Sequence, residues 1–305
     1  MEESCELSSS LVDESAKVRL QASCDEASER VRRSLDEGPL PEKPSQQTLD
    51  DYRCKRISRD LLEGLETPRE KAVFLASSDP FGSAWLRALP SYQIGTLMDP
   101  MHFRMACGIR IGSQICQGFG CIDCNSKVEP DGLHPLSCNK SAGRQSRHAE
   151  LNQILQRSLR RAKIPSTLEP NDLNLEERVR PDGITITPWS NGKSLIWDVT
   201  VSCTAAESYV NHTAFTSGWA AERAAVEKSR KYASFGQRYI FVPVAMETLG
   251  PVCKEASEFF KQLAHRLESV TGERREGEFL RQRLSIAVWR GNLISISQAM
   301  GLERR

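Results

Sequence analysis

Two aspartates near the middle of the chain have the residue type and spacing for cation-dependent chemistry. Asp182 precedes an alternating run at residues 184–187, and Asp198 lies late in a second β-rich run at residues 194–201, after an Asn-Gly turn. This pattern is typical of a hairpin, and antiparallel pairing brings the start of one strand beside the end of the other. Neighbouring carboxylates in an apolar sheet are costly unless they share a proton or a cation. Since Mg²⁺ and Mn²⁺ prefer oxygen ligands, the sequence predicts such a site at Asp182 and Asp198.

A cationic side chain for this pair is predicted to come from a later helix. Thr200, two residues after Asp198, carries no charge and cannot replace an ammonium group. Residues 220–232 read as a helix on which Lys228 and Lys231, three positions apart, share one face. Either lysine can orient a water or offset charge that develops on a phosphate; Lys228 is favoured slightly because it lies nearer the start of the helix. The alternative interpretation is structural, with Asp182 closing a turn and Asp198 ending a strand.

A second group of residues has the spacing of a structural zinc site. Two cysteines are separated by two residues, a histidine follows after nine more, and a third cysteine after another three: Cys121, Cys124, His134 and Cys138. Three thiolates and one imidazole suit a closed tetrahedral Zn²⁺ site with no open position for catalysis. Cys107 and Cys116 lie just upstream and are alternative ligands. The site is expected to hold together a loop-rich segment that has little core of its own.

A basic helix is predicted directly after this group. Leucine and isoleucine repeat at helical spacing over residues 147–162. Arg144, Arg147 and His148 at its start suit contacts with phosphates, which supply most sequence-independent affinity for nucleic acid. The alternative is a solvated helix face without a ligand.

Composition divides the chain into four segments. Residues 1–50 carry a net charge of −6 and read as a mostly disordered acidic tail with a possible short helix at residues 15–34, and the remainder carries +7. A helical segment is expected at residues 51–115, the zinc knuckle at 116–139 and an α/β domain at 140–305. A strand is expected at residues 238–246, connected to the hairpin by a parallel crossover, with Glu247 at its end. Helices are expected at residues 252–270 and 278–300.

The sequence contains few signals for the cellular compartment or the oligomeric state of the protein. No run reaches the roughly 18 apolar residues of a membrane span, and no signal-peptide core is present. We therefore expect no membrane partner and a nuclear or cytoplasmic protein. The sequence carries no signal for the oligomeric state.

The order of these motifs resembles the C-terminal region of non-LTR retrotransposon proteins of the restriction-like class. The resemblance is carried by an Ala-Trp-Leu-Arg-Ala-Leu-Pro segment from residue 84, the Cys-Cys-His-Cys group, an Arg-His helix start, Arg-Pro-Asp ending at Asp182, Asp-Val-Thr from Asp198, and Lys-x-x-Lys-Tyr from Lys228. The lysine usually found two residues after the second acid is missing. No polymerase segment or Tyr/Phe-x-Asp-Asp motif occurs.

The resemblance implies both a fold and an activity. The fold is a restriction-endonuclease-like α/β domain, a mixed sheet flanked by helices with a PD-(D/E)-x-K site, preceded by a helical segment and a zinc knuckle. Because the first helix of this fold can present an acid to the metal, Glu150 is a further candidate catalytic residue. The implied activity is metal-dependent nicking of DNA, with retroelement RNA as a second possible partner. The alternatives are an inactive nucleic-acid-binding remnant and a zinc-stabilised interaction protein.

Overall fold

The computed structural model describes residues 14–34, 45–141, 143–170 and 180–302, which belong to two compact units, Met1–Leu65 and Glu66–Arg305. The first unit contains helices α2 (Glu14–Ser34) and α3 (Gln46–Gly64). The helix expected at residues 15–34 is confirmed by α2. The disorder expected over residues 1–50 falls partly on residues 1–13 and 35–44, which lie outside the described residues, whereas residues 14–34 and 46–50 are helical.

The second unit begins with short helices, and two of them pack on the C-terminal helix. Helix α4 (Pro68–Ser78) starts with a capping box between Thr67 and Glu70, and is followed by these two, the 3₁₀ helix η1 (Ala84–Arg87) and α5 (Pro100–Arg110). In η1, the ring of Trp85 lies 5.5 Å from that of Trp289, measured between centroids. Trp289 belongs to α11 (Glu276–Ala299), so this segment shares a core with the end of the chain.

The domain is mixed α/β and contains a four-stranded mixed sheet. The strands are β3 (Ser166–Leu168), β4 (Gly183–Thr185), β5 (Ser194–Ser202) and β6 (Tyr239–Glu247), in that order across the sheet. The predicted hairpin is confirmed, because β4 pairs antiparallel with β5 and Asn191 and Gly192 turn with φ of 50° and 71°. The predicted parallel crossover is confirmed as well, because β6 runs parallel to β5.

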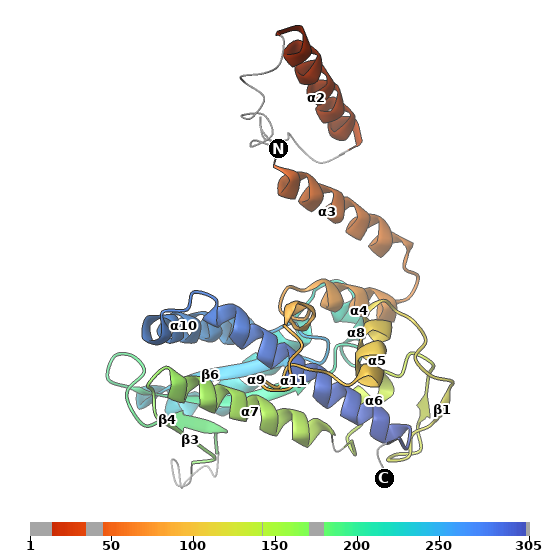
Figure 1. The fold of residues 1–305 in the computed structure, drawn as a ribbon. Helices are drawn as coiled ribbons and strands as arrows, with labels where there is room; N and C mark the ends of the chain where they lie inside the picture. Colours follow the sequence, from red (N-terminus) through yellow and green to blue (C-terminus); the bar gives the residue numbers. More distant parts are fainter. Residues whose placement is uncertain (1–13, 35–44, 142, 171–179, 303–305) are drawn as a thin grey trace. The chain divides into compact units, whose positions relative to one another are not determined.

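Helices cover the sheet and define its two faces. Helices α7 (Gly143–Arg161), α10 (Lys254–Thr271) and α11 pack together over one face, as Figure 1 shows, where Leu195, Trp197 and Val199 of β5 enter the main core. Alternate residues of a strand point to opposite faces. Ile196 therefore packs on the other side with Tyr232, and Asp198 shares that side. Helices α8 (Val210–Thr213), α9 (Trp219–Lys231) and η2 (Ala233–Gln237) form the connection between β5 and β6.

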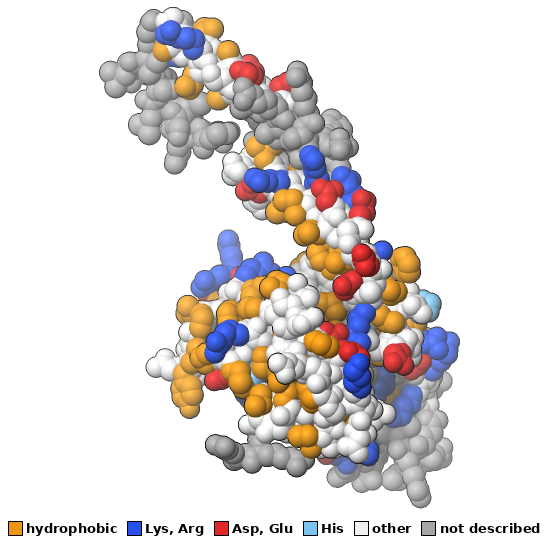
Figure 2. Space-filling view, turned by 90° about the vertical axis from the view of Figure 1, so that its right-hand side faces the viewer, with side chains coloured by type: hydrophobic (Ala, Val, Ile, Leu, Met, Phe, Trp, Pro, Cys, Tyr) orange, Lys and Arg blue, Asp and Glu red, His pale blue; other side chains and the backbone are white. Residues whose placement is uncertain are grey.

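The surface of the second unit exposes hydrophobic side chains between η1 and α5. Figure 2 shows the side on which α5 lies, with hydrophobic groups among charged ones. The side chains that are at least two-fifths exposed in this region are Leu86, Leu89, Tyr92, Ile94, Leu97 and Phe103. Within the described ranges, no helix combines the length and the hydropathy needed to span a bilayer.

Candidate active site and metal centre

The predicted zinc ligands converge on one point. The ligand atoms of Cys121, Cys124, His134 and Cys138 all lie within 4.8 Å of one another, and Cys124 Sγ is 3.2 Å from His134 Nε2. A set of three thiols and one imidazole at this separation can hold a tetrahedral metal ion such as Zn²⁺. The structure thus confirms a Cys-Cys-His-Cys group that could bind a metal.

Local backbone structure brings these four residues together. Strands β1 (Phe119–Gly120) and β2 (Lys127–Val128) pair antiparallel around the first two cysteines, and Asn125 closes the turn with φ of 63°. The short helix α6 (His134–Ser137) supplies the histidine and leads into Cys138. Cys121 and Cys138 are buried against Ala299 at the end of α11. The group is therefore anchored on the same helix that packs over the four-stranded sheet.

The two upstream cysteines lie outside the group. Cys116 Sγ is 3.5 Å from the carbonyl oxygen of Pro130, and Cys107, on α5, packs at the edge of the neighbouring core. Within the group, hydrogen bonds from Ser126 lower the pKa of the Cys124 thiol to about 6, whereas burial raises the pKa of Cys138 to about 11. Metal ligation uses the deprotonated thiolate, so a bound cation would favour ionisation of both groups.

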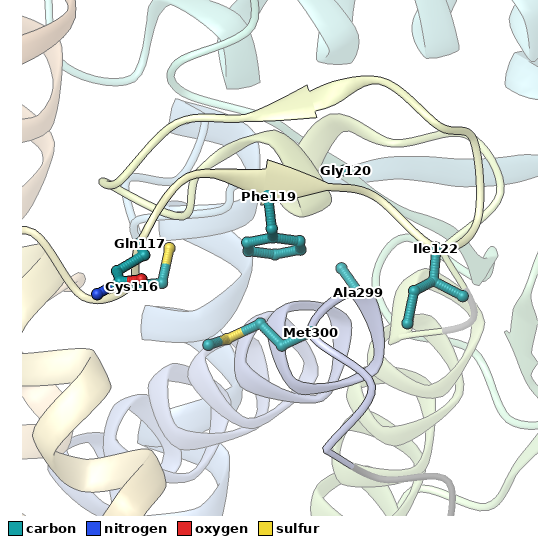
Figure 3. Close-up of a pocket in the computed structure, with 7 residues that line it drawn as sticks. All are labelled: Cys116, Gln117, Phe119, Gly120, Ile122, Ala299 and Met300. Carbon is teal, nitrogen blue, oxygen red and sulfur yellow. The ribbon is translucent and has the colours of Figure 1, made fainter.

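A pocket of about 430 Å³ lies beside the metal group. Figure 3 shows the side chain of Phe119 directed toward Ala299 and Met300 at the end of α11, with Cys116 and Ile122 at the sides. The lining is mostly apolar and includes none of the four ligand residues. The pocket therefore lies between β1 and the end of α11, beside the contact of the knuckle with Ala299, and none of the four ligand residues lines it.

The second predicted group, around Asp182 and Asp198, also comes together. The backbone N–H of Val199 donates to Asp182 Oδ2 at 2.6 Å, and the N–H of Asp182 donates to the carbonyl oxygen of Trp197 at 2.9 Å. Asp182 therefore lies directly against the strand that carries Asp198. The Asp182 side chain is 19% exposed and that of Asp198 only 6%, so the pair is accessible from the Asp182 side.

The downstream helix places a lysine on Asp198. Lys228 Nζ lies 2.5 Å from Asp198 Oδ1, whereas Lys231 Nζ lies over the ring of Tyr232, 5.5 Å from its centroid. Of the two lysines considered, Lys228 is thus the one in contact with a carboxylate. The hydroxyl of Thr200, at the position where the lysine of the motif is missing, is 3.5 Å from Asp198 Oδ1.

Tyr232 holds the other oxygen of Asp198. Its hydroxyl is 2.6 Å from Asp198 Oδ2 and 2.8 Å from the carbonyl oxygen of Arg180, and its ring stacks on Phe241. Burial, together with the neighbouring Asp198 carboxylate, raises the pKa of Tyr232, so the phenol stays protonated and can donate. The packing of Tyr232 against Ile196 of β5 is therefore accompanied by a polar contact with Asp198.

His148 contributes an imidazole that contacts Asp182. Its Nε2 lies 2.8 Å from Asp182 Oδ2, and this hydrogen bond raises the pKa of His148 above its usual value against the opposing effect of burial. Burial also raises the pKa of Asp182, but the hydrogen bond and charge of His148 and the N–H of Val199 outweigh it, and the pKa of Asp182 is lowered overall. His148, which was predicted to contact nucleic acid, is thus part of the carboxylate cluster.

The other candidates on α7 lie in different environments. Arg144 is exposed and donates to Asn139 Oδ1 at 2.8 Å, which leaves it free to meet a phosphate. Arg147 is only 2% exposed and donates to Asn292 Oδ1, so the prediction that it contacts nucleic acid is wrong. Glu150 is two residues from His148 and therefore points about 200° away from it around the helix. Within the described part of the chain, no hydrogen bond or ion pair joins Glu150 to the cluster. The structure does not bring Glu150 to the two aspartates.

Comparison of the chain with family models gives no match, and comparison with curated proteins gives none either. Function therefore has to be inferred from the chemistry of the two sites.

Sequence reasoning missed one polar residue at the carboxylate cluster. Asn152 is 5% exposed, accepts a hydrogen bond from the indole N–H of Trp197 at 2.9 Å, and lies 3.5 Å from both ring nitrogens of His148. The signal was its position four residues after His148, which places both on one face of the helix.

Glu247 lies at the end of β6 and supports the helix that carries Lys228. It is fully buried, and its Oε1 accepts a hydrogen bond from the N–H of Ala220 at 2.9 Å. The N-cap residue of α9, Gly218, has φ of 83° and supplies no side-chain cap. Glu247 therefore caps α9 from the neighbouring strand, and this cap lies about 12 Å along the helix from Lys228.

Replacement of Glu247 by glutamine should change how stability depends on pH. Burial raises the pKa of Glu247 to about 7 from 4.5. The fold therefore favours the protonated form, and this contribution to stability is present below the unfolded pKa and is lost as pH rises through about 7. Glu247→Gln has no charge to bury, so it should be more stable than the wild type by about 3 kcal/mol at about pH 8 and nearly equal at about pH 4. Urea unfolding across this pH range measures the effect; a parallel dependence in both proteins would contradict it.

Proposed function

We propose that this chain is a metal-dependent DNA endonuclease with a restriction-endonuclease-like core, of the kind found at the C-terminus of non-LTR retrotransposon proteins. The observation that carries the proposal is the contact between Lys228 and Asp198 beside Asp182. A lysine supplied by the following helix replaces the one that the motif lacks at Thr200. The mixed sheet, with one acid before β4 and the other within β5, supports the same assignment.

The donor atoms of the cluster fit a hard divalent cation. Asp182 accepts a hydrogen bond from the N–H of Val199, the residue after Asp198, and the cluster also contains His148 on Asp182 and Lys228 on Asp198. Mg²⁺ or Mn²⁺ takes such carboxylates together with water and phosphate oxygens. Asp182 and Asp198 would hold the cation, which when bound polarises the scissile phosphate and lowers the pKa of a bound water.

The chain's own residues account for the remaining requirements of phosphodiester hydrolysis. Lys228 presents an ammonium group at the carboxylates and can offset the negative charge that develops on the phosphate in the transition state. Tyr232 binds the other oxygen of the Asp198 carboxylate, and this contact fixes the orientation of the carboxylate toward Lys228. Arg144 lies one helical turn before His148 and is exposed, so it can contact the backbone of a bound nucleic acid.

A supercoiled-plasmid nicking assay with Mg²⁺ or Mn²⁺ tests the proposal, and the two lysines of α9 form a matched pair for it. Lys228→Ala should lower the rate of nicking by about 10²-fold, because a preorganised cation beside the phosphate is lost. Lys231→Ala removes an equal charge three residues away and should stay within about twofold of wild type. A larger loss of nicking rate in Lys231→Ala than in Lys228→Ala would show that Lys228 is the wrong assignment.

A second candidate function is nucleic-acid binding without cleavage. It is favoured because both carboxylate oxygens of Asp198 already have a partner, Lys228 on one and Tyr232 on the other, without a divalent cation. Salt-dependent DNA binding by a folded wild-type protein that shows no nicking with either cation would support this function in place of the nuclease.

A further inference from the structure

Trp197 precedes Asp198 on β5, accepts a hydrogen bond from the N–H of Asp182 at its carbonyl oxygen, and is fully buried. It pairs across the hairpin with Gly183, the residue after Asp182. A Cβ atom at Gly183 would lie 2.0 Å from Cζ2 of the Trp197 ring. The indole therefore occupies the space above Gly183, and its position is fixed relative to the backbone of Asp182.

The indole N–H determines the orientation of the Asn152 amide. Trp197 Nε1 can only donate a hydrogen bond, so the Asn152 atom 2.9 Å from it is the amide oxygen. The amide nitrogen of Asn152 must then point the other way. It lies 3.5 Å from both ring nitrogens of His148.

We infer that Asn152 is a positioning residue that, held by Trp197, orients the His148–Asp182 pair. The inference rests on the proposed function for its effect on nicking, because Asp182 is a catalytic residue only in that case. The chain of contacts runs from Gly183 through Trp197 and Asn152 to His148 and Asp182. Each buried polar atom along it has a partner, as a rigid polar network requires.

Two variants and one control separate positioning from plain packing. Asn152→Ala removes the amide, and Trp197→Phe keeps an aromatic ring while removing the indole N–H. Ser158→Ala is the control, because Ser158 is also buried on α7 and its hydroxyl has no partner among the described residues. If Asn152→Ala does not fold, Trp197→Phe carries the same test.

Two measurements are made on each variant. In the nicking assay, kcat should fall about tenfold in Asn152→Ala with KM for the plasmid nearly unchanged, as for residues that orient a catalytic group. In ¹⁵N NMR of histidine-labelled, metal-free protein at alkaline pH, wild-type His148 should show one tautomer, with the proton on Nε2 facing Asp182. Asn152→Ala should show a tautomer mixture, and Ser158→Ala should match the wild type. Trp197→Phe should add little to Asn152→Ala in the double variant, because both act through one contact.

The outcomes separate this inference from the proposed function. Wild-type kcat and an unchanged His148 spectrum in Asn152→Ala would overturn the positioning role. Absence of nicking by the wild type, with the His148 spectrum altered only in Asn152→Ala and Trp197→Phe, would reject the nuclease and uphold the positioning role.

Discussion

Replacement of either aspartate of the cluster by asparagine should nearly abolish metal-dependent nicking. Asp182→Asn or Asp198→Asn removes one of the two charges that would hold the cation, whose contribution to catalysis is several kcal/mol, and the rate should fall by about 10³-fold. The amide keeps the size of the carboxylate, so Val199 and Tyr232 retain an acceptor for their hydrogen bonds. Lys228, with 27% of its side chain exposed, can turn toward solvent when Asp198 loses its charge.

Three controls make this result specific. Thermal unfolding should show that both variants remain folded, and DNA binding should persist with its dependence on salt, because exposed cations such as Arg144 are untouched. Glu150→Gln removes an acid from α7 that lies outside the cluster, and it should nick within about twofold of wild type. Equal nicking by wild type and the Asp182→Asn/Asp198→Asn double variant would show that the assignment is wrong.

Loss of the metal ligands of the knuckle should unfold that segment and destabilise the chain. The group has a small core of its own, formed by Cys121, Val128, Cys138 and Ala299. Structural zinc contributes about 10–16 kcal/mol of apparent binding free energy in zinc-finger peptides. Only part of this binding free energy contributes to the stability of the whole domain, so Cys124→Ser should lower Tm by about 10 °C. Nicking should fall with it, because Cys138 accepts a hydrogen bond from Ser141 at the approach to α7, which carries His148.

Cys116→Ser is the matched control for the zinc prediction. Cys116 lies upstream of the four ligands, and its thiol contacts backbone carbonyl groups of residues 129 and 130. Metal analysis by atomic emission should find about one zinc per chain in wild type and Cys116→Ser, and much less in Cys124→Ser. Zinc that is retained by Cys124→Ser and lost from Cys116→Ser would show that Cys116, and not Cys124, is a ligand.

Several features could be predicted because they depend on residues close together in the chain. The four ligands of the metal group lie within 18 consecutive residues, from Cys121 to Cys138. The hairpin follows from its Asn-Gly turn and alternating strands, and the parallel β6 follows from the long helical connection before it. Local geometry and connection length decide these features, so no knowledge of the core is needed.

The composition of the carboxylate cluster was decided by packing. Helix α7 turns Leu151 and Leu155 into the core, and that rotation carries His148 and Asn152 to the sheet while it buries Arg147 and leaves Glu150 outside the cluster. In the same way, α9 presents Lys228 to Asp198 and leaves Lys231 over Tyr232. The sequence by itself determined the metal ligands, the hairpin and the two aspartates. Only the tertiary structure decided which cations meet them, because the rotation of a helix about its axis is set by long-range contacts with the sheet.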